Sequence, residues 1–451
     1  MTVSNAGQRI IVIGAGISGL AAGYRLQQAG HQVTVLESAD HVGGKMTTLE
    51  RDGFRIDIAA TILFATYHRM LQLIDELDLT DQIHPVAATA GIYTPNGPHY
   101  LRTDKATDLL FTRLLSLRSK LALINLIRDV RRIKGLDFTD GTTANQIDTE
   151  SVAAYGKRRL TPQLMESLCA PINDYYLAPA ETASLATMFS IFQIISGGCC
   201  FGTKNGVQFL PDALARRLDV RLSACATSVE ENSTGVTVTW DRPGEAEHIE
   251  HADGAVITVP GCHVPTLYGQ LPPGQRDFLN QLPYEKNLVI YLGVDRLLPS
   301  KTLWLTAPGS KSIIGGVVEH NKGPGRLPTG QDLLSIYWSP PWIERHWERD
   351  DPYLVDAAVE GASRLLALDV DGHLVTSHVQ RWNTCVVSNR PGDIQALTAF
   401  VHSLSRTSRV QLAGDYFAGL PCTNSSLVQG ERAADRLLEA LIATRSSRKR
   451  R

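Results

Sequence analysis

The sequence predicts an α/β fold in which a parallel sheet is assembled from segments far apart in the chain. Two patterns carry this prediction: a strand–helix–strand unit at residues 9–37 and a strand–loop–helix unit at residues 410–441. The length of 451 residues is a third observation, since it allows two interlocked domains or one large domain with an insertion. Strands that alternate with helices favour a parallel sheet that is covered by helices.

The first unit occupies residues 9–37. Its opening strand is the apolar run RIIVI, and GAGISG follows at once. The next stretch predicts a helix to about residue 29, because Gly30 is a helix stop signal. The second strand, HQVTVLE, ends in an acid, Glu37.

Each part of this unit has a physical reason to bind a dinucleotide. Gly14 permits a tight turn, Gly16 lets the backbone approach a pyrophosphate, and Gly19 lets helix and strand pack closely. The helix N-terminus offers free N–H groups to phosphates, and Glu37 can accept hydrogen bonds from a ribose. An ordinary glycine-rich turn is the alternative, but here an acid also ends the next strand. The candidate cofactor residues are Gly14, Ala15, Gly16, Ile17, Ser18, Gly19, Glu37 and Ser38.

The residues after Glu37 decide between NAD and FAD. SADHVGGKMTT carries a glycine pair, and DGFRIDIAAT follows it. These stretches resemble the two-part signature of the flavin amine oxidase superfamily, which includes monoamine oxidases, protoporphyrinogen oxidases and phytoene-type desaturases. The resemblance implies a Rossmann-like FAD-binding domain, with Lys45 beside the flavin where most members carry arginine. It adds Gly43, Gly44, Lys45, Met46, Ala60 and Thr61 to the cofactor site.

A second block is similar to the family's other FAD signature. It reads VQLAGDYFAGLPCTNSSLVQGERAADRLLEAL, from Val410 to Leu441. The resemblance implies that Asp415 accepts a hydrogen bond from the ribityl chain. It also implies that the start of the following helix points N–H groups at the flavin, where they stabilise the negative charge of the reduced ring. The residues assigned in this way are Gly414, Asp415, Thr423, Asn424 and Ser425, with the backbone near Ala226 pairing with the adenine.

The resemblance implies an FAD-binding domain that is interleaved with a substrate domain, part helical and part mixed sheet. The predicted ranges are 1–84, 205–265 and 376–441 for the FAD-binding domain, 85–204 for the helical part, 266–375 for the sheet part, and 442–451 for a disordered basic tail.

The resemblance also implies the reaction, which is hydride transfer to flavin from a CH–NH or CH–CH bond. Simple monoamine oxidases hold the amine between two aromatic side chains, but the matching places here are Cys385 or Val386, and Cys422. A bulkier substrate in a wide apolar cavity is therefore favoured. The candidate cavity residues near the flavin are Trp382, Cys422 and Phe64. A non-redox or structural flavoprotein is the alternative function.

Some amine oxidases hold a water near the flavin with a lysine from the substrate half. Lys311, Lys322 and Arg326 are the candidates for such a role in this sequence, no pattern chooses among them, and a solvated loop charge is the default interpretation of each.

The amino-acid composition limits the classes of partner and the cellular compartment that we expect. The formal net charge of −2 gives no general attraction to nucleic acid. Seven cysteines without a CxxC motif predict reduced thiols and a cytoplasmic protein. Scattered histidines show no metal-ligand spacing. The sequence has a single GxGxxG motif and therefore no visible second nucleotide site for NAD(P)H. Oxygen or a separate molecule is thus the expected electron acceptor for the oxidation of a small molecule. The oligomeric state stays open.

No apolar run is long enough to span a bilayer. Residues 114–136, LLSLRSKLALINLIRDVRRIKGL, predict an amphipathic helix with a basic face. Such a helix suits either the core or peripheral contact with a membrane, and the core interpretation is the favoured one.

Overall fold

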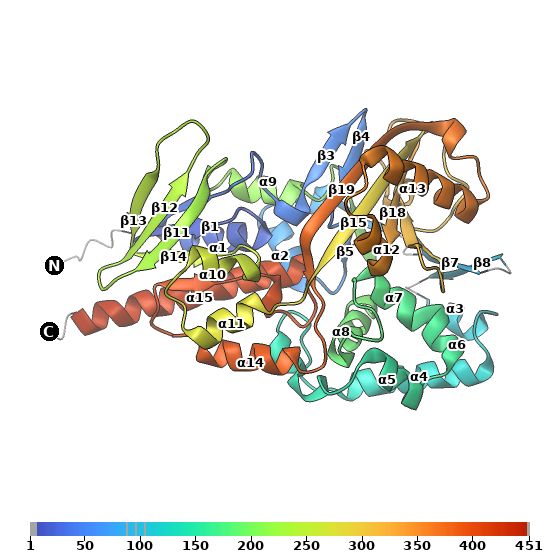
Figure 1. Ribbon diagram of the computed structural model, residues 1–451, viewed down its shortest axis with the longest axis horizontal. Coiled ribbons are helices and arrows are strands. Elements are labelled where there is room, and N and C mark those ends of the chain that lie inside the picture. The colour runs from blue at the N-terminus through green and yellow to red at the C-terminus, as the bar shows by residue number, and fades with distance from the viewer. Residues whose placement is uncertain (1–6, 87–88, 95–96, 103–104, 449–451) are drawn as a thin grey trace.

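The computed structural model describes residues 7–86, 89–94, 97–102 and 105–448. Figure 1 shows two halves: a sheet with flanking helices on the left, and a second sheet above a layer of helices on the right. This mixed architecture confirms the predicted α/β fold class.

The left half is built on a five-stranded parallel sheet. Its strands, in spatial order, are β10 (Asp219–Arg221), β2 (Gln32–Leu36), β1 (Arg9–Ile13), β14 (Gly254–Ile257) and β20 (Val410–Leu412). Four of the five β1 residues are buried, because a parallel strand with both faces covered is apolar throughout. The strands at both ends of the chain thus meet in one sheet, as the two sequence patterns predict.

Helices cover both faces of this sheet. On one face lie α1 (Ile17–Gln28), α2 (His68–Glu76), α9 (Phe209–Ala215) and α15 (Thr423–Arg448). On the other lie α10 (Val264–Leu267), α11 (Pro273–Asn280), α14 (Asp393–Ser403) and the antiparallel sheet of β11 (Cys225–Glu231), β12 (Val236–Asp241) and β13 (His248–Ala252). Helix α1 ends where predicted, since Gly30 adopts a positive φ of 87°.

The right half contains a seven-stranded mixed sheet. Its order is β19 (Leu374–Val387), β15 (Tyr284–Val294), β18 (Asp332–Trp338), β17 (Ile313–Val318), β16 (Trp304–Thr306), β7 (Thr89–Thr94) and β8 (Gly97–Arg102). Helices α12 (Pro340–His346) and α13 (Asp351–Leu366) share an apolar core with it. The structure also contains two small sheets: β3–β4 (Thr48–Arg51, Phe54–Asp57) and β5–β9–β6 (Leu63–Phe64, Cys200–Thr203, Ile83–Val86).

A layer of helices lies beneath the second sheet in Figure 1. It comprises α3 (Ala106–Phe111), α4 (Leu117–Arg132), α5 (Val152–Arg159), α6 (Pro162–Leu164), α7 (Ala170–Tyr175) and α8 (Leu185–Ile195). Strands β7 and β8 come from the range expected to be helical and instead extend the second sheet, where Ile92 and Leu101 are buried. The domain boundaries themselves stay a prediction.

The C-terminal residues differ from the expectation of a disordered tail beginning at residue 442. Helix α15 continues to Arg448, because this stretch contains good helix formers and neither glycine nor proline. Residues 449–451 of that predicted tail lie outside the described residues. Among the residues that are described, none of the helices combines the length and apolarity needed to cross a bilayer.

Candidate active site

The predicted cofactor residues meet at the carboxyl edge of the parallel sheet. Gly14 follows β1, Glu37 follows β2, Thr258 follows β14 and Asp415 follows β20. Carboxyl ends of parallel strands share one edge, which is where ligands bind in such sheets. All four residues line a single cavity of about 570 Å³. This size lies in the usual range for sites that hold a small molecule or cofactor.

The GAGISG turn forms an open cradle in this cavity. Gly14 has a φ of 101°, which favours glycine, and a Cβ on Gly19 would lie 1.9 Å from the Gly14 carbonyl oxygen. A Cβ on Gly16 would meet nothing within 4 Å, so this position faces free space. No side chain caps the N-terminus of α1, whose first N–H groups therefore remain available to phosphates.

The glycine pair closes the other side of the cradle. The Gly43 N–H donates to the Ala15 carbonyl oxygen at 2.9 Å, which joins the pair to the first turn. Gly44 has a φ of 55°, and a Cβ there would lie 3.5 Å from the Gly16 Cα. Both glycines thus keep side chains out of the space where a pyrophosphate would lie.

Backbone groups hold the Glu37 carboxylate in place. The Ala15 N–H donates to its Oε2 at 2.6 Å, and the Ala39 N–H donates to its Oε1 at 2.8 Å. Each carboxylate oxygen can accept a further bond, so Glu37 can still receive a ribose hydroxyl. The cradle, the helix N-terminus and this acid together fit the pyrophosphate and ribose of FAD.

Lys45 and Asp415 form an ion pair across the cavity wall. The Lys45 Nζ lies 3.0 Å from the Asp415 Oδ2. Burial by itself would lower the pKa of Lys45, but Asp415 outweighs this and raises the pKa above its ordinary value, so Lys45 stays protonated. The resemblance assigned these residues separate contacts to the flavin, and their direct pairing is a feature that the sequence did not reveal.

The start of α15 also faces the cavity, through Thr423 and Ser426. Gly430 lets α15 pack on α1, because a Cβ there would lie 2.0 Å from the Ser18 carbonyl oxygen. Two predicted residues of this turn have structural contacts instead. The Asn424 Oδ1 accepts the Met70 N–H at 3.0 Å, and the Ser425 Oγ donates to the Leu420 carbonyl oxygen at 2.9 Å.

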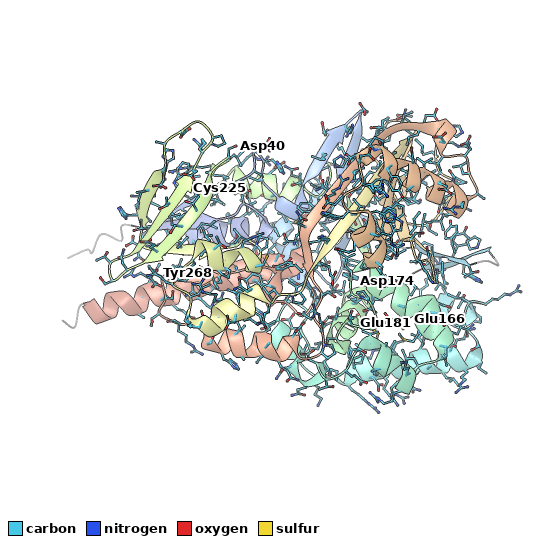
Figure 2. All side chains as sticks on the ribbon, in the orientation of Figure 1. Asp40, Glu166, Asp174, Glu181, Cys225 and Tyr268 are labelled. Carbon is cyan, nitrogen blue, oxygen red and sulfur yellow. The ribbon has the colours of Figure 1, made fainter. Side chains whose placement is uncertain are left out.

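Most of the predicted cofactor residues line the cavity, and five others do not. The lining residues are Gly14, Gly16, Ile17, Ser18, Glu37, Ser38, Gly43, Gly44, Lys45, Met46, Ala60, Thr61, Gly414, Asp415 and Thr423. Ala15 and Gly19 are part of the turn behind the lining, and Asn424 and Ser425 are buried. Ala226 is also absent from the lining; it follows Cys225, which Figure 2 labels on the β11–β13 sheet.

Aromatic side chains surround the half of the cavity away from the cradle. Phe64 stacks on Trp304 with ring centroids 6.0 Å apart, and Tyr175 lies 5.4 Å from Tyr337 by the same measure. Tyr67 and Tyr176 add two more rings to the lining. We call this half, defined by these six side chains, the aromatic chamber. Burial raises the pKa of Tyr67 and Tyr176, so both hydroxyls stay neutral.

The three predicted catalytic-side residues all line the cavity. Phe64 belongs to the aromatic chamber, while Trp382 and Cys422 lie at its border with the cofactor half. The Trp382 indole N–H donates to the Ile58 carbonyl oxygen at 3.0 Å, which fixes the ring. Trp304, Tyr67, Tyr176 and Tyr337 were missed by the sequence reasoning, because they come from stretches that carry no specific motif.

The candidate lysines of the substrate half do not line this cavity. Lys322 and Arg326 are at most 1% exposed and belong to a buried ion cluster with Asp57 and Glu319. The Arg326 guanidinium lies 2.6 Å from Asp57, and the Lys322 ammonium lies 2.8 Å from Glu319. Burial lowers the pKa of Lys322 despite these acids. The third candidate, Lys311, is exposed and also absent from the lining.

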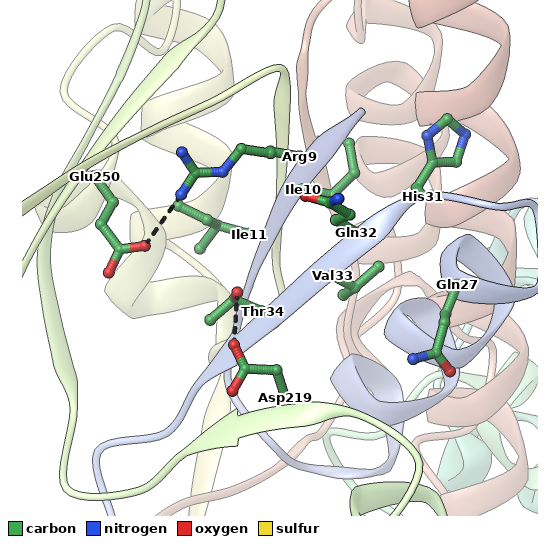
Figure 3. A pocket seen from close by; sticks show the side chains of 10 residues that line it. All are labelled: Arg9, Ile10, Ile11, Gln27, His31, Gln32, Val33, Thr34, Asp219 and Glu250. Atoms are coloured by element: carbon green, nitrogen blue, oxygen red, sulfur yellow. Dashed lines mark hydrogen bonds and ion pairs between the residues drawn. The ribbon is translucent and has the colours of Figure 1, made fainter. Parts of the chain in front are cut away.

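A second cavity, of about 650 Å³, lies at the opposite edge of the parallel sheet. Figure 3 shows two polar pairs among its lining side chains: Arg9 faces Glu250 at 3.9 Å, and the Thr34 hydroxyl donates to Asp219 at 3.0 Å. The amino ends of parallel strands are not where α/β sheets bind ligands. The cavity at the carboxyl edge is therefore the candidate active site.

Comparisons with known proteins agree with this geometry. The chain is 25% identical over 327 residues to protoporphyrinogen oxidase 2, chloroplastic/mitochondrial, of Arabidopsis thaliana, covering 62% of this chain and 63% of that protein. It is 25% identical over 352 residues to an L-amino-acid oxidase of Demansia vestigiata, covering 73% of this chain and 66% of that protein. The matches thus span just under two thirds of each relative.

The fold has a solved counterpart in cyclohexylamine oxidase of Brevibacterium oxydans. The two structures superpose with a TM-score of 0.77 at 16% identity, over 97% of this chain and 100% of the other, a likeness that concerns the fold alone. The family model described as "Flavin containing amine oxidoreductase" matches residues 17–438. The chain therefore belongs to the flavin-containing amine oxidoreductase family, which confirms the resemblance and the flavin cofactor that the motifs predict.

Proposed function

We propose that this chain is an FAD-dependent oxidoreductase that takes a hydride from a CH–NH or CH–CH bond of a bulky small molecule. One observation carries the proposal: a single cavity joins a dinucleotide cradle to the aromatic chamber. A bound flavin would supply the hydride acceptor, with oxygen or another acceptor receiving the electrons afterwards. Seven free cysteines support a reducing compartment such as the cytoplasm.

The residues of the chain would bind the cofactor and orient it in the cavity. The α1 N-terminus and Glu37 would hold the pyrophosphate and a ribose. The N-terminus of α15, where the Cys422 Sγ already accepts the Ser425 N–H at 3.4 Å, would favour negative charge on the side of the ring that it faces. Lys45, kept protonated by Asp415, adds a fixed positive charge at the same wall.

The charged residues in the cavity lining indicate which class of substrate fits there. Among the described residues, the charged side chains that line the cavity are Glu37, Lys45 and Asp415, and each is already held by a protein partner. The aromatic chamber thus offers no charge to pair with a carboxylate or an ammonium group, and burying an unpaired charge is costly. This favours a bulky, uncharged and largely apolar substrate over an amino acid.

Anaerobic reduction of the flavin tests the proposal. Lipophilic amines and partly reduced polycyclic compounds should be mixed with the FAD-loaded protein without oxygen. A substrate is expected to bleach the absorbance of the oxidised flavin, and air should restore it. If dithionite reduces the bound flavin but no compound in the panel does so, the result would favour a structural flavoprotein instead.

The exposed face of α4 supports a peripheral membrane contact as part of this proposal. One face of the helix is packed through Ala122, Leu123 and Leu126. The opposite face carries Leu117 and Ile124, which are 75% and 44% exposed, with Leu121 between them at 56%. Four exposed arginines on the same helix surround this apolar face: Arg118, Arg128, Arg131 and Arg132. Exposed apolar side chains can enter a lipid surface, and arginines on the same helix can contact anionic head groups.

Replacing the three exposed apolar side chains with glutamate should release the protein from vesicles. We expect the protein to sediment with vesicles of phosphatidylcholine and phosphatidylglycerol, and the L117E/L121E/I124E variant to bind at least about tenfold more weakly. The matched control is I249E/L297E/V375E, which alters exposed apolar residues outside α4. Equal sedimentation of both variants would remove the membrane contact from the proposal.

A further inference from the structure

Two polar side chains in the cavity wall, those of Ser18 in the cradle and of Asn287, have a buried atom without a hydrogen-bond partner among the described residues. Asn287 lies on β15, is 9% exposed, and its buried Oδ1 makes no hydrogen bond within the described part of the chain. A buried polar atom without a partner is destabilising, and native proteins keep few of them. Because Asn287 also lines the candidate active site, a ligand is the natural source of the missing hydrogen bond.

The strand geometry explains why this side chain faces the cavity. Asn287 pairs with Trp382 of β19, and the register between the two strands shifts between Glu285 and Asn287. Such an irregularity turns a side chain away from the regular alternation of a strand. The seven residues after it in β15 are apolar and buried, whereas the three before it are only half-buried, so the amide lies where the buried apolar part of the strand begins.

The polar neighbours of Asn287 are already occupied. The Trp382 N–H donates to Ile58, and the Lys45 ammonium pairs with Asp415. Cys385 also lines the cavity, next to Asn287 and Lys45. Burial raises the pKa of its thiol, and the charge of Lys45 and a hydrogen bond with the Asn287 side chain oppose that rise. Asn287 thus belongs to the cluster that contains the predicted cofactor residues Lys45 and Asp415.

We propose that the Asn287 carboxamide hydrogen-bonds the flavin ring of bound FAD. A carboxamide offers a donor and an acceptor without a charge, which matches a ring whose edge alternates carbonyl and nitrogen groups. The placement of Asn287 beside Lys45 and Asp415 favours the flavin over the substrate as its partner. This inference rests on the proposed function, since it needs FAD in the cavity.

Titration of the apoprotein with FAD tests the inference directly. The Asn287→Leu variant keeps the branching and the number of side-chain heavy atoms and removes the polar ones, so it should bind FAD about tenfold more weakly, the value of one lost hydrogen bond. The melting temperature of the apoprotein should stay level or rise, because an unpartnered buried atom is gone. The midpoint potential of the bound flavin should also move.

The matched control is Asn145→Leu. Asn145 also has a buried Oδ1 without a partner among the described residues, but it is absent from the cavity lining. This variant should bind FAD as the unaltered protein does.

Two results would overturn the inference. The first is Asn287→Leu apoprotein that takes up FAD with unchanged affinity and potential, which would leave the substrate as the partner of the amide. The second is a variant whose apoprotein melts at a lower temperature while its FAD affinity is unchanged, which would assign Asn287 a structural role. Failure of the proposed function looks different, because the unaltered protein would then either take up no FAD or keep its bound flavin oxidised with every member of the substrate panel.

Discussion

The Gly16→Val variant is expected to fold normally and to lose FAD. Gly16 has ordinary extended dihedral angles, with φ −69° and ψ 172°, so valine fits its backbone. Its side chain would project into free space within the cradle, where the pyrophosphate is expected. Because the valine side chain would occupy the space expected for the pyrophosphate, we expect about 100-fold weaker FAD binding. Fluorescence titration of the apoprotein measures the affinity, and thermal unfolding measures the fold.

Gly269→Val is the control for this variant. Gly269 is exposed, a Cβ there also meets nothing within 4 Å, and it is absent from the cavity lining. Both apoproteins should melt within about 2 °C of the unaltered protein. If Gly16→Val binds FAD as tightly as Gly269→Val does, the cradle does not hold the pyrophosphate.

The Asp57→Asn variant should lose about 3 to 5 kcal/mol of unfolding free energy. Asp57 and Arg326 are fully buried and lie 2.6 Å apart, with Glu319 and Lys322 completing the cluster. The Asp57 Oδ1 also accepts the Val207 N–H at 3.0 Å, so the acid joins three distant segments. Removing its charge leaves the buried Arg326 without its nearest counterion. Urea unfolding, followed by circular dichroism, measures the loss.

Glu360→Gln provides the comparison for the buried cluster. Glu360 pairs with Arg364 at 3.2 Å on α13, but the two side chains are 70% and 74% exposed. An exposed pair of this kind contributes about 0.5 kcal/mol or less. Similar unfolding midpoints for Asp57→Asn and Glu360→Gln would contradict a stabilising role for the cluster.

The predicted cofactor residues of the first unit lie together in the structure because their sequence signals are local. The turn from Gly14 to Gly19 and the acid at Glu37 lie within one strand–helix–strand unit, where spacing alone fixes their geometry. The second block, which contains Asp415, was placed against the first through the family resemblance. Its packing on α1 depends on Gly430, whose importance follows only from the close approach of the two helices.

The aromatic chamber could not be predicted in the same way. Phe64, Tyr176, Trp304 and Tyr337 come from four separate segments, and no periodicity in the chain says that their rings will meet. One signal was present for Asn287, which is an uncharged polar residue at the start of the apolar run LVIYLGV. A polar residue at the start of a buried strand is an exception that calls for a partner.

The ion cluster shows a different limit of sequence reasoning. The sequence favours a solvated loop charge for Lys322 and Arg326, with a role near the flavin as the alternative, and neither interpretation anticipates a buried ion cluster. Asp57 and Glu319 instead hold both cations in a buried position behind the lining. The ion pair between Asp57 and Arg326 joins residues that are 269 positions apart, and pairing at such a separation leaves no trace in local composition.

The central claim is that the two distant FAD motifs close around one flavin that can be reduced. The most direct measurement is the visible spectrum of the purified protein, followed by its denaturation to count released flavin and by anaerobic addition of substrate. We expect one FAD per chain and bleaching by a bulky apolar substrate. A colourless protein that takes up no added FAD would contradict the account.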